Sequence, residues 1–254
     1  MFDTSAIKQN FGDAAPQYDA HADLQRTVRR HCLKLAAQRW GTGAHVLDVG
    51  CGTGALAVES TKQAWRVTQL DMAYGMCKHA AQYGHAVNAD AESLPFTDSV
   101  FDGLFSSLML QWSNTPVRVF SEMSRVLKPH GSIILSTLTD GTLLELKETF
   151  AAVDNVPHVS NFLSVHSVLK AADQNGLSLT SAQRVPLVEY YPDTIALMRN
   201  LQAIGASNKE AARKRGLSTP RQFARLESLY KQRYGTQKGL PATWQVLFLV
   251  LGKD

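Results

Sequence analysis

The chain has 254 residues, of which 44% are hydrophobic and 19% are charged, and its formal net charge is +4. This composition is too apolar for a disordered chain and predicts one large domain, or one domain with an insert. The longest apolar run, Val246–Leu251, is far shorter than the ~20 residues that span a bilayer. The first twenty residues lack the pattern of a secretory signal, and the three cysteines show neither disulfide nor zinc-ligand spacing. We therefore expect a cytoplasmic protein without disulfides or metal.

The first forty residues have helical patterns, with Ser5 and Asp23 as the expected N-caps. Short apolar runs then alternate with helical patterns such as Val117–Leu127. The expected strands of this region are His45–Gly50, Arg66–Asp71, His85–Asp90, Val100–Ser107 and Gly131–Thr137. Such alternation predicts an α/β fold, a doubly wound parallel sheet with helices on both faces.

The pattern changes after Leu138. Two helical segments, Leu143–Val153 and Ser164–Asn175, are followed by a strand at Ser178–Tyr191, and Thr243–Leu251 reads as the final strand. We predict three parts: a helical lid over residues 1–40, a Rossmann-like domain over 41–192 and 241–254, and a basic helical insert over 193–240.

Positive charge is concentrated in that insert. The stretch Lys209–Lys238 holds nine lysines and arginines and two glutamates, so the rest of the chain is net negative. A basic segment of this kind indicates an acidic partner. The segment lacks the interleaved aromatic residues that are typical of single-strand nucleic-acid binding.

The strongest motif is VLDVGCGTG, over Val46–Gly54. A predicted strand runs into Gly50, Gly52 and Gly54, where a backbone without Cβ atoms can turn sharply or approach a ligand closely. The G-x-G-x-G spacing differs from the dinucleotide fingerprint, and no Gly-Lys-Ser/Thr follows as in a P-loop.

An acidic residue lies near the end of each of three successive predicted strands. These residues are Asp48, Asp71 and Asp90. Because parallel strands of an open α/β sheet end at one edge, their carboxylates are expected at one ligand site. Asp71 is placed to accept hydrogen bonds from ribose hydroxyls, and Asp90 from an amino group of a base. Alternatively, each acid caps the helix that follows it.

The order of motifs resembles class I S-adenosylmethionine-dependent methyltransferases. The segments that carry the resemblance are VLDVGCGTG, QLDMAYGM, NADAESLPF, FDGLFSSLMLQW and EMSRVLKPHGSIILST. The resemblance implies a seven-stranded, mostly parallel sheet whose last strand is antiparallel, with S-adenosylmethionine as cofactor and S-adenosylhomocysteine as product. The implied cofactor-binding residues are Asp48, Gly50, Cys51, Gly52, Gly54, Asp71, Met72, Asp90, Ala91, Ser107 and Leu108.

The flanks narrow the resemblance to the malonyl-acyl carrier protein O-methyltransferase family of biotin synthesis. The segments KQNFGDAAPQYDAHADLQ, LMLQW and MRNLQAIGA carry it, whereas Ser107 stands where asparagine is expected. The resemblance implies transfer of a methyl group to the free carboxylate of a malonyl thioester. Such a carboxylate is already ionised at neutral pH, so alignment and water exclusion are needed rather than a base.

Arg199 and Tyr18 are the predicted catalytic residues. The guanidinium of Arg199 suits a carboxylate, and Tyr18 would close the methyl-transfer chamber. His21, Gln111 and Trp112 are predicted with Arg199 to bind substrate. The alternatives are a surface arginine, packed core aromatics for Tyr18 and Trp112, and a capping histidine. Cys51 is expected to be a small loop residue and not a nucleophile.

Acyl carrier protein, which is small and acidic, is the implied partner of the basic insert. The expected docking residues are Lys209, Arg213, Lys214, Arg215, Arg221 and Arg225, although a solvated helix face would have the same composition. Other possible functions are methylation of a free small carboxylic acid, a quinone precursor or RNA, and cofactor binding by a non-catalytic regulator.

Overall fold

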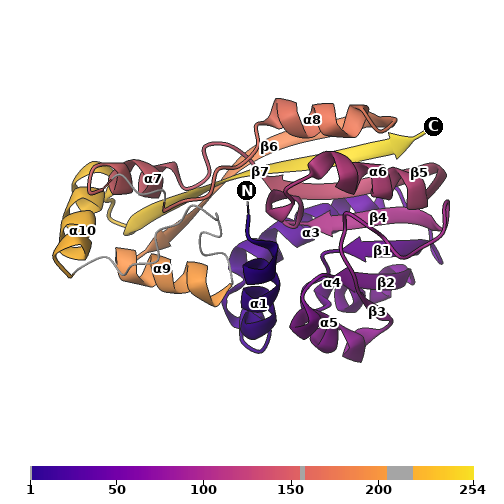
Figure 1. The fold of residues 1–254 in the computed structure, drawn as a ribbon, viewed down its shortest axis with the longest axis horizontal. Coiled ribbons are helices and arrows are strands. Elements are labelled where there is room, and N and C mark those ends of the chain that lie inside the picture. Colours follow the sequence, from indigo (N-terminus) through magenta and orange to yellow (C-terminus); the bar gives the residue numbers. More distant parts are fainter. Residues whose placement is uncertain (1, 155–157, 205–219) are drawn as a thin grey trace.

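The structure is a computed structural model that describes residues 2–154, 158–204 and 220–254. One seven-stranded sheet has the order β3-β2-β1-β4-β5-β7-β6, and helices cover it on both faces (Figure 1). The strands are β1 His45–Val49, β2 Arg66–Asp71, β3 Ala86–Asn88, β4 Phe101–Ser107, β5 Leu127–Leu138, β6 Leu177–Tyr191 and β7 Leu240–Lys253. Strands β1 to β5 pair in parallel, and β7 is antiparallel to both β5 and β6. The expected class I methyltransferase sheet is confirmed.

Three helices precede the first strand, and the other helices lie singly or in pairs between strands. Their bounds are α1 Thr4–Ala14, α2 Tyr18–His21, α3 Asp23–Ala37, α4 Ala55–Glu59, α5 Tyr74–Ala80, α6 Pro116–Val126, α7 Leu144–Ala151, α8 Val165–Asp173, α9 Thr194–Ala203 and α10 Pro220–Tyr234. Three short 3₁₀ turns follow α4, α5 and β4, at Thr61–Gln63, Ala81–Tyr83 and Leu110–Trp112.

Each central strand is buried on both faces. Val46 of β1 belongs to the core cluster that contains α3, whereas its neighbour Leu47 belongs to the cluster that contains α6 and α8. Successive side chains of a strand point to opposite faces of the sheet, so a continuous apolar run contributes side chains to the cores on both faces. Because β1, β2 and β4 are parallel, their carboxyl ends lie at one edge of the sheet.

Strands β6 and β7 are longer than the rest of the sheet. β7 pairs with β5 from Gly252 to Val246, whereas its pairing with β6 continues to Leu240. The segment Leu240–Gln245 therefore forms a two-stranded ribbon with β6 that projects beyond β5, and α7, α9 and α10 lie around it (Figure 1). Helices α9 and α10, which belong to the predicted basic insert, lie beside this ribbon (Figure 1). Residues 209, 213, 214 and 215 of the expected docking set lie outside the described residues.

Helix α1 begins one residue before the expected cap. The side chain of Asp3 accepts a hydrogen bond from the Ala6 amide, so Asp3 and not Ser5 is the N-cap. Helix α3 begins at Asp23, which forms an ion pair with Arg26 instead of capping. Both cap predictions were wrong, because short polar residues are frequent near both helix starts and only the backbone selects one.

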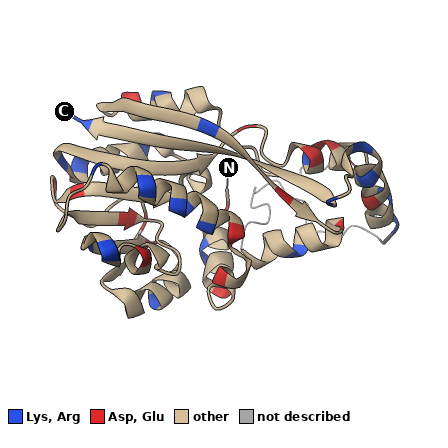
Figure 2. Ribbon diagram, turned by 180° about the vertical axis from the view of Figure 1, so that it is seen from behind, with Lys and Arg blue, Asp and Glu red and all other residues tan. Residues whose placement is uncertain are grey.

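Charged residues are distributed over much of the surface, with lysines and arginines prominent on α10 (Figure 2). Arg221 and Arg225 are exposed on this helix, whereas Lys231 pairs with Glu227 at 2.8 Å. None of the described helices combines the length and apolarity that a bilayer crossing requires.

Candidate active site

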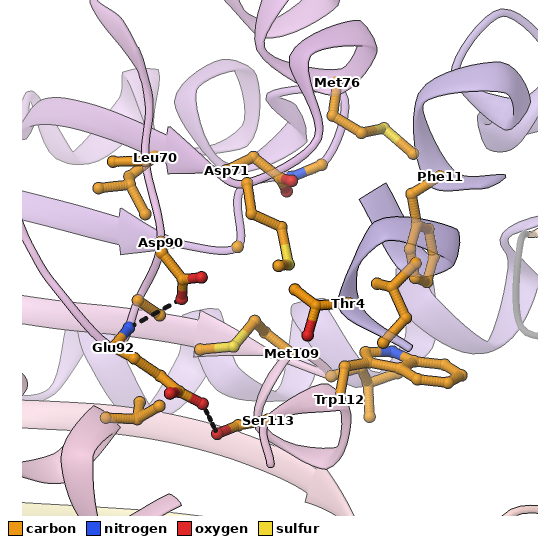
Figure 3. Close-up of a pocket in the computed structure, with 18 of the residues that line it drawn as sticks. Thr4, Phe11, Leu70, Asp71, Met76, Asp90, Glu92, Met109, Trp112 and Ser113 are labelled. Carbon is orange, nitrogen blue, oxygen red and sulfur yellow. Dashed lines mark hydrogen bonds between the residues drawn. The ribbon is translucent and has the colours of Figure 1, made fainter. Parts of the chain in front are cut away.

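A pocket lies at the carboxyl ends of β1, β2 and β4, and α1 forms its outer wall (Figure 3). Its cavity volume is about 150 Å³, and it opens to solvent. The predicted residues that line it are Tyr18, Gly50, Gly52, Asp71, Met72, Asp90, Ala91, Ser107, Leu108 and Trp112. Residues far apart in the sequence are therefore brought to one site, although their individual roles stay predictions.

The glycine loop forms part of the pocket floor. The amides of Gly50 and Cys51 both donate to the carbonyl of Leu70, at 2.8 and 2.9 Å, which turns the chain away from β1. Gly52 has a φ of +56°, and a Cβ placed there would meet no atom within 4 Å. The open space beside Gly52 is therefore available to a ligand that approaches the bare backbone.

Gly54 was predicted to bind the cofactor together with Gly50 and Gly52, but its surroundings differ from theirs. It does not line the pocket, and a Cβ at this position would lie 2.8 Å from the Ala80 Cα and 2.5 Å from Gln69 Oε1. Gly54 is thus required for close packing of α4 against its neighbours. Cys51 is also absent from the pocket wall, and burial raises the pKa of its thiol.

Asp71 is fixed by two backbone amides. Its Oδ2 accepts from the Gly52 amide at 3.0 Å, and its Oδ1 accepts from the Ala73 amide at 2.8 Å. A carboxylate has about four lone-pair positions, so each oxygen keeps acceptor capacity for a ligand hydroxyl. Burial raises the pKa of Asp71, whereas these amide hydrogen bonds lower it. Asp71 is accordingly a well-oriented acceptor that is part of the pocket wall.

The turn after β3 presents two more acids. Asp90 Oδ1 accepts from the Glu92 amide at 3.0 Å, and Glu92 Oε1 accepts from the hydroxyl of Ser113 at 2.8 Å (Figure 3). Asp90, Ala91 and Glu92 all line the pocket. This turn lies on the opposite side of the pocket from α1.

Asp48 is only 3% exposed and does not line the pocket. Among the described residues, no donor forms a hydrogen bond with its carboxylate. Burial raises its pKa to about 8, the Arg29 guanidinium lowers it and the Asp71 charge raises it. Arg29 is itself held by Glu59, through Nε–Oε2 and Nη2–Oε1 distances of 3.1 and 2.8 Å. The positive charge of Arg29 is therefore shared between Asp48 and Glu59.

Tyr18 reaches the pocket from α2, which is tied to the glycine loop by a hydrogen bond from Thr53 Oγ1 to Asp19 Oδ1 at 2.9 Å. Burial raises the pKa of the Tyr18 hydroxyl, and the charge of Asp71 raises it further. The hydroxyl is therefore protonated at neutral pH.

Trp112 contacts the ring of Phe11 edge-on, with 5.5 Å between ring centroids. The neighbouring Gln111, which was predicted to bind substrate, is not among the residues that line the pocket. Its amide donates to the Leu108 carbonyl at 2.6 Å and accepts from Thr137 at 3.1 Å, which turns it into the core. Leu108 has a φ of +55°, and the 3₁₀ turn Leu110–Trp112 that follows it points successive side chains about 120° apart.

His21 and Arg199 also lie outside the pocket wall. Both are exposed, His21 on α2 and Arg199 on α9. The two helices meet where the Asn200 amide donates to the His21 carbonyl at 3.4 Å. Arg199 is therefore next to the α2 side of the site and not inside it.

Several lining residues were not predicted. They are Thr4, Ile7, Phe11, Leu70, Met76, Ala89, Glu92, Met109, Ser113, Asn114 and Val119. The i, i+4 spacing of Ile7 and Phe11 does signal a helix face, but it does not say which surface that face covers. Met109, Ser113 and Asn114 follow a positive-φ residue in a loop, and no periodic signal marks them.

The chemistry of the pocket fits S-adenosylmethionine. Its described wall contains Asp71, Asp90 and Glu92 but no lysine, arginine or histidine, and most other lining side chains are apolar. Such a wall favours a cationic ligand with a nucleoside and disfavours phosphates. Gly52 leaves room for a ligand against the backbone, while Asp71 and Asp90 retain acceptor capacity. These residues would hold the cofactor.

Comparisons with known proteins agree with this fold and pocket. A family described as "Methyltransferase domain" matches residues 47–135. The solved structure of the YcgJ protein from Bacillus subtilis has a TM-score of 0.62 at 17% identity, covering 89% of this chain and 99% of that one. Geranyl diphosphate C-methyltransferase from Streptomyces coelicolor, in a complex containing S-adenosylhomocysteine, has a TM-score of 0.56 at 16% identity, covering 92% and 82%. These similarities concern the fold.

Closer relatives extend over the whole chain. The malonyl-acyl carrier protein O-methyltransferase of Yersinia pestis is 36% identical, with 99% of this chain and 92% of the relative covered. The biotin biosynthesis bifunctional protein BioHC of Teredinibacter turnerae is 39% identical over 97% of this chain. This chain spans about half of that bifunctional relative, 46% of its length. On these matches, the chain belongs to the malonyl-acyl carrier protein O-methyltransferase family.

Proposed function

We propose that the chain transfers the methyl group of S-adenosylmethionine to the free carboxylate of a malonyl group on acyl carrier protein, at the start of biotin synthesis. The observation that carries the proposal is the pocket wall, with Gly52 open to a ligand and three acids without a cation among its described residues. Family membership supports the choice of acceptor, since relatives of similar length are named for it.

When bound, S-adenosylmethionine supplies a methyl group on a positively charged sulfur. The residues of the chain orient and shield the reaction. Asp71 is placed to accept from the ribose, and Asp90 from the base. Phe11, Met109 and Trp112 provide apolar walls that exclude water, which strengthens electrostatic interactions inside the site.

Tyr18 is suited to orient the acceptor. Because its hydroxyl stays protonated at neutral pH, it can donate a hydrogen bond to the carboxylate oxygen that does not attack. A malonyl carboxylate is ionised already, so Tyr18 need not remove a proton. Holding the attacking oxygen in line with the methyl group supplies the main rate advantage.

Arg199 is the proposed cation for the malonyl carboxylate. It is exposed on α9, beside the α2 side of the site. The described pocket wall itself holds no cation, so a carboxylate-selective contact must come from outside the wall. A guanidinium binds a carboxylate through two parallel hydrogen bonds.

We further propose that acyl carrier protein docks on the basic insert. Arg221 and Arg225 are exposed on α10, and Lys209, Arg213, Lys214 and Arg215 precede this helix in the sequence. An acidic carrier would be steered by this charge.

The direct test is to incubate the protein with malonyl-acyl carrier protein and S-adenosylmethionine carrying a labelled methyl group. The expected product is a methyl ester on the acyl chain, with one S-adenosylhomocysteine formed per ester. Free malonate and carrier protein without a malonyl group are the controls. Equal labelling of free malonate would favour a free-acid methyltransferase, and cofactor binding without turnover would favour a regulator.

A further inference from the structure

The amino-terminal end of α1 is attached to the protein through Asn114. The amide of Phe2 donates to Asn114 Oδ1 at 2.7 Å, and Asn114 Nδ2 donates to the carbonyl of Phe2 at 3.0 Å. One side-chain amide thus pairs with both polar groups of one residue, as a neighbouring strand would. The ring of Phe2 then contacts Trp112, with 5.8 Å between centroids. Asn114 and Phe2 will be called the latch.

The residues on both sides of Asn114 are held by one carboxylate. Glu92 Oε1 accepts from the Ser113 hydroxyl at 2.8 Å and from the Thr115 amide at 3.2 Å. The Thr115 amide also donates to Ser113 Oγ at 2.9 Å. Glu92 thus holds the side chain of the residue before Asn114 and the backbone amide of the residue after it, which restricts the direction in which the Asn114 side chain projects.

Glu92 in turn belongs to the turn proposed to receive the base. Asp90 Oδ1 fixes the Glu92 amide at 3.0 Å, and both residues line the pocket. A continuous series of polar contacts therefore runs from the base side of the pocket, through Glu92 and the Ser113–Thr115 loop, to the latch. Figure 3 shows its first part, from Asp90 to Ser113.

The latch supports the wall that α1 contributes. Thr4, Ile7 and Phe11 of this helix all line the pocket. A ligand that orders the Asp90–Glu92 turn would favour the seated position of α1, and seating of α1 would favour the ligand by the same factor.

We infer that Asn114 is a positioning residue, which seats α1 over the reacting groups when the base side of the pocket is occupied. This inference rests on the proposed function only in requiring a nucleoside cofactor in the pocket. The acceptor can be a malonyl thioester or another acid without altering it.

The test uses the full-length Asn114→Ala variant and S-adenosylhomocysteine as the probe. Losing two hydrogen bonds of ordinary strength should raise the Kd about tenfold in a calorimetric titration, which corresponds to about 1.4 kcal/mol. The matched control is Asn175→Ala. Asn175 also makes two side-chain hydrogen bonds to backbone carbonyls, those of Val117 and Ala171, but it does not line the pocket.

Amide hydrogen exchange separates positioning from general destabilisation. In the wild-type protein, saturating S-adenosylhomocysteine should slow exchange in both α1 and α5. In Asn114→Ala, α5 should remain protected at saturation while α1 exchanges at least about threefold faster than in the wild type. Asn175→Ala should lower the unfolding temperature but keep both the Kd and the protection of α1.

Three outcomes would overturn the inference. They are an unchanged Kd, full protection of α1 in Asn114→Ala, and an equal loss of protection in α1 and α5 at saturation. If the wild-type protein itself failed to bind S-adenosylhomocysteine, the proposed function would fall instead. The two failures are therefore distinguishable in one set of measurements.

Discussion

Asp48 links the charge of the site to the stability of the fold. Its carboxyl is buried beneath the glycine loop, where no described donor satisfies it, and its nearest described counter-charge is shared with Glu59. A buried carboxylate of this kind is costly to ionise. Because its pKa is raised to about 8, Asp48 is largely protonated at neutral pH in the folded protein.

We predict a pH-dependent effect of Asp48→Asn on stability. The pKa of Asp48 is about 8 in the folded protein, against an ordinary value of 3.8. Between these values the folded state binds the extra proton, so its unfolding free energy falls as pH rises, by up to about 1.4 kcal/mol per pH unit. Asparagine does not titrate, so the unfolding free energy of the variant should increase relative to that of the wild type between about pH 5 and about pH 8. Urea unfolding of both proteins across this pH range measures the effect. A difference in unfolding free energy that does not change with pH would contradict the prediction.

Gly52 and Gly54 should respond differently to alanine. Both have positive φ, so each substitution costs on the order of 1 kcal/mol in backbone strain. At Gly52 the new methyl enters open ligand space, so the Kd for S-adenosylhomocysteine should rise at least about tenfold with the fold retained. At Gly54 it collides with Ala80, which should add about 1–3 kcal/mol of destabilisation. Calorimetric titration and thermal unfolding of both variants compare the two effects.

Arg199→Ala should separate binding of the cofactor from turnover of the acceptor. Arg199 does not line the pocket, so the Kd for S-adenosylhomocysteine should stay within about twofold. Loss of the carboxylate partner should lower kcat/KM for malonyl-acyl carrier protein about 100-fold. Steady-state kinetics measure this, with Arg199→Lys as the charge-preserving control. Normal turnover by Arg199→Ala would remove its proposed role.

At the scale of elements, α1 packs against α5 where Gly12 and Gly75 meet. A Cβ on Gly75 of α5 would lie 2.5 Å from the Gly12 carbonyl oxygen and 2.7 Å from the Gly12 Cα. A Cβ on Gly12, in contrast, would have its nearest neighbour at 3.7 Å. The close contact between α1 and α5 therefore requires glycine at position 75 but not at position 12.

Gly75→Ala should displace α1 and weaken cofactor binding by about tenfold, because the added methyl meets backbone that cannot rotate away. Gly12→Ala is the matched control. It should keep the affinity and, as a helix-interior substitution, raise stability by up to about 1 kcal/mol. Limited proteolysis within residues 4–14 and calorimetric titration distinguish the variants. Equal behaviour of the two would argue against the packing account.

The sequence predicted the elements that depend on local pattern. Strand β2 was predicted residue for residue, as Arg66–Asp71. Strand β5 was predicted to begin at Gly131, but it begins at Leu127. The earlier start depends on pairing between Leu127 and Phe101 of β4, although the residues between Leu127 and Gly131 have the local sequence of a turn. The extension of β7 to Leu240 likewise depends on β6, which is distant in the sequence.

The site was predicted where a motif carries a backbone requirement. Gly50, Gly52 and Asp71 follow from strand ends and turns, and all three line the pocket. The contributions of α1 and of Asn114 depend on how a helix docks and where a loop turns back. Such tertiary choices leave no periodic trace in the sequence, which is why the latch was missed.

At the scale of the whole molecule, charge distinguishes the pocket from the surface proposed for carrier docking. The described pocket wall is acidic, whereas exposed arginines lie on α10 at the projecting ribbon (Figure 2). This arrangement allows a cationic cofactor and an acidic carrier to be attracted to different surfaces of one protein.

Added salt should therefore distinguish two methyl acceptors, malonyl-acyl carrier protein and malonyl-coenzyme A. Turnover of malonyl-acyl carrier protein at low substrate should fall at least about tenfold between about 50 and 500 mM salt, because steering by the insert is screened. Turnover of malonyl-coenzyme A, which offers less surface to the insert, should fall less. Initial rates with both substrates test this, with Arg221→Ala/Arg225→Ala reducing the salt dependence of the carrier reaction. Equal salt dependence would contradict carrier docking on the insert.

The position of Trp112 between two amino-terminal rings has a practical consequence. Phe2 and Phe11 both contact its indole, at centroid distances of 5.8 and 5.5 Å, whereas the chain's other tryptophans, Trp40, Trp65 and Trp244, are buried away from the pocket wall. Indole emission shifts to longer wavelength when the ring becomes hydrated. The protein thus contains a native optical reporter, whose colour follows the departure of those rings without any attached dye.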